Sequence, residues 1–275
     1  MSTTEFIDGA VGKIAIHDLG GAGPDTLLVC HATGFCGMVY RALAHELKDD
    51  VRVFALDMRA HGDSDAPTNE ADFDWHGSAD DVARVVTHLS ADRLHGFGHS
   101  MGGAALLEVE RSNPGTFTSA MVFEPIVPPG TFPAETPLQQ AARSRLRSFP
   151  SRGDALVRYA ARPPLGLFRA DVLHDYVHHG FRETEDGEIT LKCTPESEAS
   201  TFGMGGSIAL DSLAEIEFGV IVAKSDDGAL PALLADAIAD QLPNGRLQEF
   251  KGITHFGPLQ DPVVIAKALQ RLIAT

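Results

Sequence analysis

The chain has 275 residues, with 22 basic and 38 acidic side chains and a net charge of −16. Such an acidic chain is a poor partner for nucleic acid or for anionic membrane surfaces, because like charges repel. Hydrophobic residues make up 44% of the chain and charged residues 22%. These values are ordinary for a globular protein with one large domain, or with a core domain and an insertion.

The cysteine content indicates a reducing compartment. The three cysteines, Cys30, Cys36 and Cys193, are few and odd in number, which favours free thiols over a disulfide framework. The first six residues lack the basic and apolar stretches of a signal peptide. No apolar run reaches the roughly 18 residues that a membrane-spanning helix needs. We therefore expect a cytoplasmic protein that does not associate with membranes.

Apolar runs alternate with segments of helical apolar spacing along the chain. The predicted strands cover residues 11–17, 26–30, 51–56, 93–97, 119–123, 218–223 and 246–250. The predicted helices cover residues 38–47, 78–89, 101–112, 230–242 and 262–273. Strands that alternate with helices predict crossover connections and a mostly parallel sheet of the α/β class, flanked by helices. Functional residues of such folds lie at the carboxyl ends of the strands.

The alternation stops near residue 125, where a group of prolines disfavours regular structure. Beyond it, residues 138–149, 153–161, 170–181 and 195–202 have the pattern of short helices, with no strong strand signal among them. We therefore expect a core domain of residues 1–125 and 207–275, and a helical cap of residues 126–206.

The expected cap is rich in arginine although the chain as a whole is acidic. The arginines are Arg143, Arg145, Arg147, Arg152, Arg158, Arg162 and Arg169. A solvated helix face is the simpler interpretation. The alternative is that Arg143 and Arg147 attract an anionic substrate, because guanidinium groups bind carboxylates well.

The segment Gly98-His99-Ser100-Met101-Gly102-Gly103 lies between a predicted buried strand and a predicted helix. Gly-x-Ser-x-Gly in this setting is typical of a nucleophile elbow, a tight turn that exposes the serine hydroxyl at the sheet edge. Side chains two residues before and after the serine would collide in such a turn, which explains the glycines. Ser100 is therefore the candidate nucleophile.

A serine nucleophile needs a base within hydrogen-bond reach and an acid that orients the base. His255 is the candidate base, because it follows the last predicted strand and would lie at the same sheet edge as Ser100. Asp226 is the first candidate for the acid, since it follows the next-to-last strand. Glu124, at the end of the strand after the elbow, is a rival, and Asp227 is a further alternative.

With these motifs in the order Ser…acid…His, the chain resembles the α/β-hydrolase superfamily over nearly its whole length. The other matching residues are His31 with the tight turn that follows it, and the segment from Asp57 to Ser64 with Arg59, His61 and Gly62. The resemblance implies a mostly parallel eight-stranded sheet with the helical cap inserted after the strand that follows the nucleophile helix. It also implies an oxyanion hole formed by the backbone N–H groups of Thr33 and Met101.

The function expected from this resemblance is a serine hydrolase that cleaves a carboxylic ester or lactone through an acyl-enzyme, without a metal or cofactor. Its substrate would be a small, partly apolar molecule. The candidate pocket residues are His31, Phe35, His99, Phe132, Phe202 and Met204. The same residues allow other chemistry on this fold, namely C–C bond hydrolysis, thioester hydrolysis, acyl transfer or perhydrolysis. A non-catalytic receptor for a small ligand is a further alternative.

Overall fold

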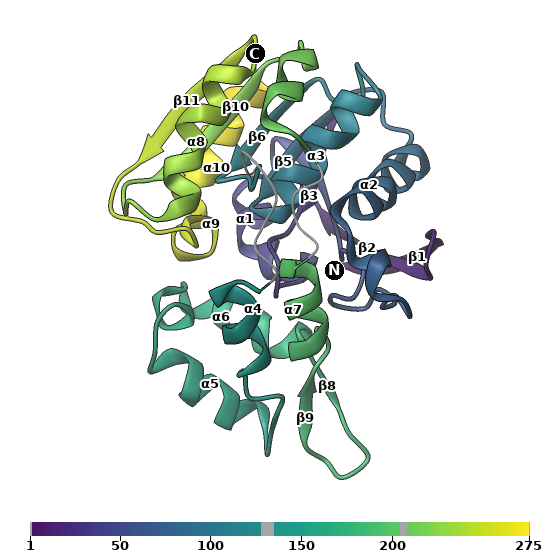
Figure 1. The fold of residues 1–275 in the computed structure, drawn as a ribbon, viewed down its shortest axis with the longest axis vertical. Coiled ribbons are helices and arrows are strands. Elements are labelled where there is room, and N and C mark those ends of the chain that lie inside the picture. Colours follow the sequence, from purple (N-terminus) through teal and green to yellow (C-terminus); the bar gives the residue numbers. More distant parts are fainter. Residues whose placement is uncertain (1, 128–134, 204–207, 275) are drawn as a thin grey trace.

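The computed structural model describes residues 2–127, 135–203 and 208–274. Its centre is an eight-stranded sheet with the order β1-β2-β4-β3-β5-β6-β10-β11 (Figure 1). The strands are β1 (Thr3–Asp8), β2 (Lys13–Gly20), β3 (Asp25–Cys30), β4 (Val51–Leu56), β5 (Leu94–His99), β6 (Ser119–Phe123), β10 (Val220–Ser225) and β11 (Gly245–Phe250). The run from β4 to β11 is parallel, whereas β2 lies antiparallel to β4 and to β1.

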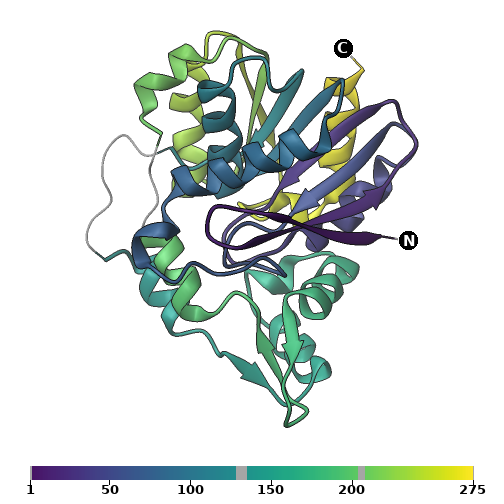
Figure 2. The same cartoon turned by 90° about the vertical axis from the view of Figure 1, so that its right-hand side faces the viewer.

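Helices cover both faces of this sheet (Figures 1 and 2). They are α1 (Arg41–Glu46), α2 (Trp75–Leu89), α3 (Met101–Ser112), α8 (Leu230–Gln241), α9 (Gly257–Gln260) and α10 (Pro262–Ile273). Side chains of β3 alternate between the faces: Leu27 and Val29 belong to an apolar cluster with α1 and α10, whereas Leu28 and Cys30 belong to one with α2 and α3. Because both faces are buried, the strands are continuous apolar runs.

Between β6 and β10 the chain leaves the sheet and forms a separate layer, which we call the inserted segment (residues 137–203). It contains α4 (Pro137–Arg143), β7 (Ser148–Phe149), α5 (Arg152–Ala160), α6 (Ala170–His179), β8 (Phe181–Glu183), β9 (Ile189–Leu191) and α7 (Pro195–Gly203). Its buried side chains, among them Phe168, Val172 and Tyr176, join the same apolar cluster as Leu43 of α1. The inserted segment therefore packs directly on the core (Figure 2).

The predicted fold, a mostly parallel eight-stranded sheet flanked by helices, is confirmed. The helix predicted over residues 262–273 is α10, which begins where Asp261 accepts a hydrogen bond from the Val264 N–H at 3.1 Å and where Pro262 occupies the first helical position. Three features were not predicted. They are strand β1, the short helix α9 and the small antiparallel sheet β7-β9-β8 of the inserted segment.

No helix in the part of the chain that the structure describes has both the length and the apolar character that crossing a lipid bilayer requires.

Candidate active site

Ser100 sits on a tight turn between β5 and α3. Its backbone has φ 54° and ψ −116°, a region that side-chain-bearing residues rarely occupy. The Ser100 N–H donates to the carbonyl of Phe123 on β6 at 2.9 Å, which ties the turn to the neighbouring strand. A Cβ atom on Gly98 would lie 2.5 Å from Gly103 Cα, and one on Gly102 would overlap the carbonyl oxygen of Cys30. The predicted steric requirement for glycine at both positions is thus confirmed.

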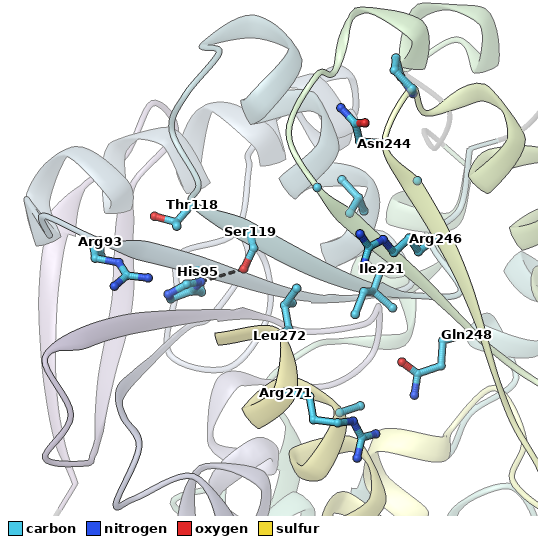
Figure 3. Close-up of a pocket in the computed structure, with 15 residues that line it drawn as sticks. Arg93, His95, Thr118, Ser119, Ile221, Asn244, Arg246, Gln248, Arg271 and Leu272 are labelled. Carbon is cyan, nitrogen blue, oxygen red and sulfur yellow. Dashed lines mark hydrogen bonds between the residues drawn. The ribbon is translucent and has the colours of Figure 1, made fainter. Parts of the chain in front are cut away.

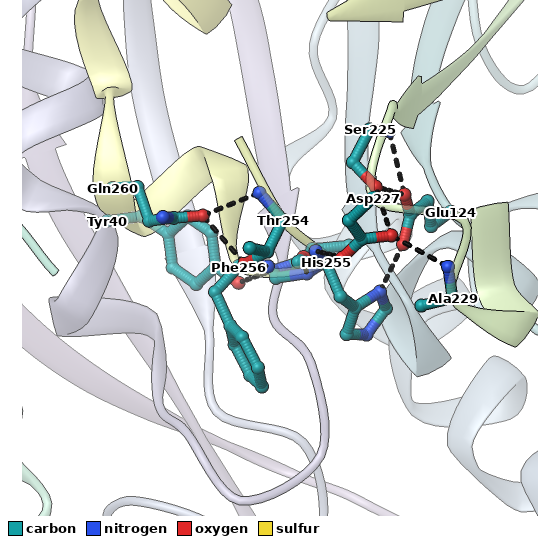
Figure 4. A network of polar contacts seen from close by, with 10 residues as sticks. Tyr40, Glu124, Ser225, Asp227, Ala229, Thr254, His255, Phe256 and Gln260 are labelled. Carbon is teal, nitrogen blue, oxygen red and sulfur yellow. Dashed lines mark hydrogen bonds and ion pairs between the residues drawn. The ribbon is translucent and has the colours of Figure 1, made fainter. Parts of the chain in front are cut away.

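The ring of His255 contacts a buried carboxylate. Its Nδ1 atom lies 2.6 Å from Oε2 of Glu124, a residue with no exposed surface (Figure 4). The other carboxylate oxygen of Glu124 accepts hydrogen bonds from the N–H of Ser225 at 2.7 Å and from its hydroxyl at 2.6 Å. A carboxylate can only accept hydrogen bonds, so we assign the His255 proton to Nδ1. Nε2 is then left with a lone pair.

The backbone at Glu124 is itself unusual. Its φ of 44° lies in the left-handed region, which is uncommon for a residue with a side chain. The carboxylate end of this residue is held by His255 and Ser225, and its N–H donates to the Ala223 carbonyl at 2.8 Å. Backbone strain of this kind persists where surrounding contacts over-determine it, and it concentrates at functional sites.

The structure corrects the prediction of the carboxylate beside His255. Asp226, the first candidate, is exposed and accepts a hydrogen bond from the Gly252 N–H at 2.9 Å, not from the imidazole. The physical reason lies in the sheet order: β6 is the direct neighbour of β5, whereas β10 is one strand farther away. Glu124, which follows β6, therefore ends closest to Ser100 and reaches the histidine from there.

Asp227 supports the His255 loop through the backbone. It accepts hydrogen bonds from the His255 N–H at 3.2 Å and from the Ala229 N–H at 2.8 Å, and at 2.9 Å it shares the single proton of the Ser225 hydroxyl with Glu124. Partial burial works to raise the pKa of Asp227, but these donors together hold it below its ordinary value. Ser225, which contacts both acidic residues, is a site residue that the sequence interpretation missed. Its position at the end of β10 was the one available signal.

The two residues predicted to form the oxyanion hole lie side by side. The hydroxyl of Thr33 donates to the Met101 sulfur at 3.5 Å. Met101 is the first residue of α3, whose N-terminal N–H groups have no partners within the helix. Neither the Thr33 N–H nor the Met101 N–H has an acceptor within the described residues. The helix dipole favours negative charge at this position.

His31 was predicted to line the pocket, and the structure corrects this. The side chain is fully buried, its Nδ1–H donates to the Ala32 carbonyl at 2.8 Å, and its Nε2 accepts from the Met58 N–H at 2.9 Å. Burial, together with the nearby His61, lowers the pKa of His31 to about 3, so the ring is neutral. His61 likewise accepts from the Gly34 N–H at 3.0 Å, and burial lowers its pKa to about 4. These two neutral rings hold the Thr33 loop against the turn after β4.

His99 is a second correction, because this predicted pocket residue has no exposed surface. Its Nδ1 accepts a hydrogen bond from the Tyr40 hydroxyl at 2.8 Å, and its Nε2–H donates to the His255 carbonyl at 2.8 Å. The Tyr40 oxygen in turn accepts from the Ala32 N–H at 3.3 Å. Burial and the neighbouring His255 hold the pKa of His99 well below its usual range. The chain of bonds therefore joins the Thr33 loop to the His255 loop.

We expect the Tyr40→Phe substitution to lower the free energy of unfolding by about 2–4 kcal/mol. It would leave the buried Ala32 N–H and His99 Nδ1 without partners, at about 1–3 kcal/mol each. Urea unfolding measures this change. Tyr159→Phe is the matched control, since the Tyr159 hydroxyl has no hydrogen-bond partner among the residues described. Equal stability of the two variants would contradict the role of the Tyr40 hydroxyl.

The other predicted pocket residues fall into two groups. Phe35 is buried at the junction of the core and the inserted segment, with its ring 5.7 Å from Phe168, 5.5 Å from Tyr176 and 6.0 Å from Phe256. Phe202 is half-buried in α7. Phe132 and Met204 lie outside the described residues. Phe168 and Phe256, whose rings lie 5.8 Å apart in a tilted arrangement, form an apolar wall next to His255.

Most arginines of the inserted segment have acidic partners. Arg143 pairs with Glu135 at 2.7 Å and Arg147 with Glu196 at 3.5 Å, in both cases at the surface. These pairs reduce the positive charge that the two arginines could offer to a substrate. Arg145 is half-buried and contacts Glu198 and the hydroxyl of Tyr176.

Arg145 and Glu198 lie beside the Thr33 loop. A Cβ atom on Gly34 would meet a Glu198 carboxylate oxygen at 2.6 Å and the Arg145 guanidinium at 3.4 Å. Gly34 has φ 86°, so glycine is favoured here both by conformation and by the close approach of this ion pair. The ion pair therefore lies against the residue that follows Thr33, next to the candidate oxyanion hole.

One group of side chains has the composition of a metal site. Possible ligand atoms of His17, Asp57 and Asp63 lie within 4.8 Å of one another. The Asp57 carboxylate, however, already accepts from His17 at 2.9 Å and from the N–H groups of Gly37 and Asp63, both at 2.7 Å. Asp63 pairs with Lys192 at 2.6 Å. These bonds use the oxygen lone pairs, which favours a structural role at the turn after β4.

The sequence is similar to a known family and to a characterised relative. The sequence profile of the Alpha/beta hydrolase family matches residues 27–268. A non-heme chloroperoxidase from Streptomyces lividans is 28% identical over 220 residues, which are 76% of this chain and 76% of the relative.

Two solved structures have similar folds. E-2-(acetamidomethylene)succinate hydrolase superimposes with a TM-score of 0.80 at 20% identity and covers 100% of both chains. An esterase from Rhodococcus sp. superimposes with a TM-score of 0.74 at 18% identity, over 100% of this chain and 98% of the other. At these identities the two structures establish a common fold.

Proposed function

Since the chain belongs to the alpha/beta hydrolase family, we propose that it is a serine hydrolase that cleaves a carboxylic ester or lactone through an acyl-enzyme intermediate. The observation that carries this proposal is that Ser100 lies on a strained turn directly after His99, whose ring binds the His255 carbonyl, and that Nδ1 of His255 is held by a fully buried glutamate. This arrangement activates a serine hydroxyl, because the second imidazole nitrogen is left free to accept its proton.

In the proposed reaction, Ser100 Oγ attacks the substrate carbonyl while His255 Nε2 takes the hydroxyl proton. The hydrogen bond from the His99 ring to the His255 carbonyl places the His255 loop next to the residue before Ser100, with the two imidazole rings 5.1 Å apart. The Ser100 hydroxyl has no hydrogen-bond partner among the described residues, and nucleophile–base bonds of free enzymes are commonly long before substrate binds. Glu124 keeps the imidazole in the reactive tautomer and stabilises the imidazolium that forms.

The negative charge of the tetrahedral intermediate would face the N–H groups of Thr33 and Met101. One such donor typically stabilises the transition state by about 3 kcal/mol. His255 then returns the proton to the leaving alcohol, which departs and leaves Ser100 acylated. Water attacks the acyl-enzyme with the help of His255, and the acid is released.

We assign substrate selection to a cap of residues 126–206 over a core of residues 1–125 and 207–275. Support comes from the inserted segment, which packs on the core next to both reactive loops through Phe35, Phe168 and Phe256. Their aromatic surfaces favour a partly apolar acyl or alcohol group. The Arg145–Glu198 ion pair beside Gly34 has no net charge and offers polar contacts to the same substrate.

A second candidate function uses the same residues with peroxide as the nucleophile in the second step. The similarity to a non-heme chloroperoxidase favours it. Attack of hydrogen peroxide on the acyl-enzyme would release a peracid in place of the acid. The peracid would be formed by the same addition and elimination at the acyl carbonyl.

Active-site labelling tests the proposal. We expect a fluorophosphonate probe to modify the protein once, with the adduct on the peptide that contains Ser100, and nitrophenyl esters of short acids to be hydrolysed. Protein unfolded in urea before treatment is the control and should not react. A folded protein that neither labels nor hydrolyses any ester of the series would contradict the proposal and favour a ligand-binding receptor. Peracid formation from acetate and hydrogen peroxide would support the second candidate.

A further inference from the structure

A groove of about 890 Å³ opens at the amino ends of the parallel strands (Figure 3). Residues that precede or begin β5, β6, β10 and β11 form its floor, and the last turn of α10 forms one wall. Ser100, Glu124 and His255 all follow the carboxyl ends of strands. The six residues of β5 separate the two edges by about 17 Å at roughly 3.3 Å per residue. The groove is thus distinct from the candidate active site.

The side chains that line the groove are basic or neutral. They include Arg93, Arg246 and Arg271, and no Asp or Glu lines it in the described part of the chain. Figure 3 shows these arginines around the groove, on segments that are far apart in the sequence. Arg93 lies 3.5 Å from Asp25. Arg246 and Arg271 have no carboxylate within 4.0 Å among the residues described.

The geometry of β11 and α10 explains why arginines from distant segments line the same groove. Alternation along β11 puts Arg246 on the same face as Gln248, and both line the groove, whereas Leu247 and Glu249 point to the other face. On α10, Ala268 and Arg271 are three residues apart and share one face. The three arginines therefore line one groove, although the chain as a whole carries a net charge of −16.

The floor of the groove leaves room for a ligand. A Cβ atom on Gly219, one of the lining residues, would meet nothing within 4 Å. Gln248 adds an amide group that can donate hydrogen bonds, and Asn244, whose amide nitrogen donates one proton to the Glu217 carbonyl at 2.6 Å, has a second N–H. A long polyanion such as nucleic acid would meet the acidic remainder of the surface and be repelled, whereas a small anion would contact the groove alone.

We propose that this groove binds a small, multiply charged anion that carries phosphate or carboxylate groups. Guanidinium groups bind both kinds of oxyanion in bidentate fashion, and two or three of them around one cavity match a ligand with several negative charges. The proposal is independent of the hydrolase function, because no residue of the groove belongs to the candidate active site.

Isothermal titration calorimetry with pyrophosphate and with citrate tests the proposal, and the two ligands distinguish phosphate from carboxylate recognition. We expect one ligand per chain, and affinity reduced about tenfold or more in Arg246→Ala/Arg271→Ala, the size expected for the loss of charge-assisted hydrogen bonds. Arg158→Ala/Arg162→Ala is the matched control. It removes the same charge from another hollow, on the inserted segment, where both arginines are exposed.

Three outcomes would overturn the proposal: no binding of either anion to the unaltered protein, equal weakening in both double variants, or unchanged binding in the groove variant. Equal weakening would show that only overall charge matters. Thermal unfolding midpoints should be unchanged in both variants, because the substituted side chains are exposed, and ester hydrolysis should be unchanged in the groove variant, because Arg246 and Arg271 line the edge of the sheet opposite Ser100. A protein that binds the anions but hydrolyses no ester would contradict the proposed function and leave this inference standing.

Discussion

Replacement of Ser100 by alanine is expected to lower kcat for ester hydrolysis by about 10⁶-fold, the loss seen when a serine nucleophile is removed from a comparable triad. The structure explains why no neighbour could substitute for the hydroxyl. Ser100 occupies the strained turn itself, and the adjacent His99 ring is committed to Tyr40 and to the His255 carbonyl. A stopped-flow assay with a nitrophenyl ester measures both the burst of acylation and the steady-state rate, and both should disappear.

Ser112→Ala provides the control for this experiment. Ser112 lies at the end of the same helix α3, is exposed, and donates to Glu108 at 3.2 Å. Its replacement should leave kcat within a factor of about two, because exposed substitutions away from the reacting atoms have small effects. A Ser100→Ala protein with unaltered turnover would show that another residue is the nucleophile, and the proposed mechanism would have to be abandoned.

Glu124→Gln is expected to lower kcat by about 10⁴-fold with a much smaller effect on KM. The N–H of Ser225 requires an acceptor, so the amide oxygen of the glutamine would face it and the NH₂ group would face His255. Nδ1 would then have to accept a hydrogen bond, which moves the imidazole proton to Nε2. That tautomer cannot take the proton from Ser100.

Asp226→Asn and Asp227→Asn are the matched comparisons. The Asp226 carboxylate accepts a hydrogen bond from the Gly252 N–H and not from His255. Its replacement should therefore change kcat by less than about threefold. Asp227 accepts from the His255 backbone and should have an intermediate effect. A loss of 10⁴-fold in Asp226→Asn with little change in Glu124→Gln would reverse the assignment of the acid. Rates of fluorophosphonate labelling provide a second readout that does not depend on the substrate.

Sequence patterns sufficed for those parts of the fold where local signals are strong. Strands buried on both faces are apolar runs, and α10 has a capping aspartate followed by proline, so both could be recognised. Strand β1 could not be, since it is an exposed edge strand whose side chains, apart from one, face solvent and carry no alternating pattern. The strands of the inserted segment have only two or three residues, too few for a periodicity to be detected.

For the site, the sequence could locate the candidate residues but could not predict which way their side chains point. Ser100 and His255 follow from the ends of strands, but which carboxylate reaches the histidine depends on the order of strands in the sheet, and connection order in the chain does not determine it. Nor does sequence tell whether an imidazole faces a pocket or the interior. His31 and His99 stand beside reactive residues in the chain, and both turn inward to backbone groups or to Tyr40.

The register between β5 and β6 has a consequence for how such a protein can diverge. His99 pairs with Phe123, so Ser100 and Glu124 extend from neighbouring strands at the same level. Their separation is set by the spacing of adjacent strands, about 4.8 Å, and not by the length of any loop. Insertions or deletions in the surface loop after Asp227 would shift the backbone contacts of His255 and leave the distance between Ser100 and Glu124 unchanged. In a lineage of such sequences, loop length could drift there while this distance is inherited with the sheet.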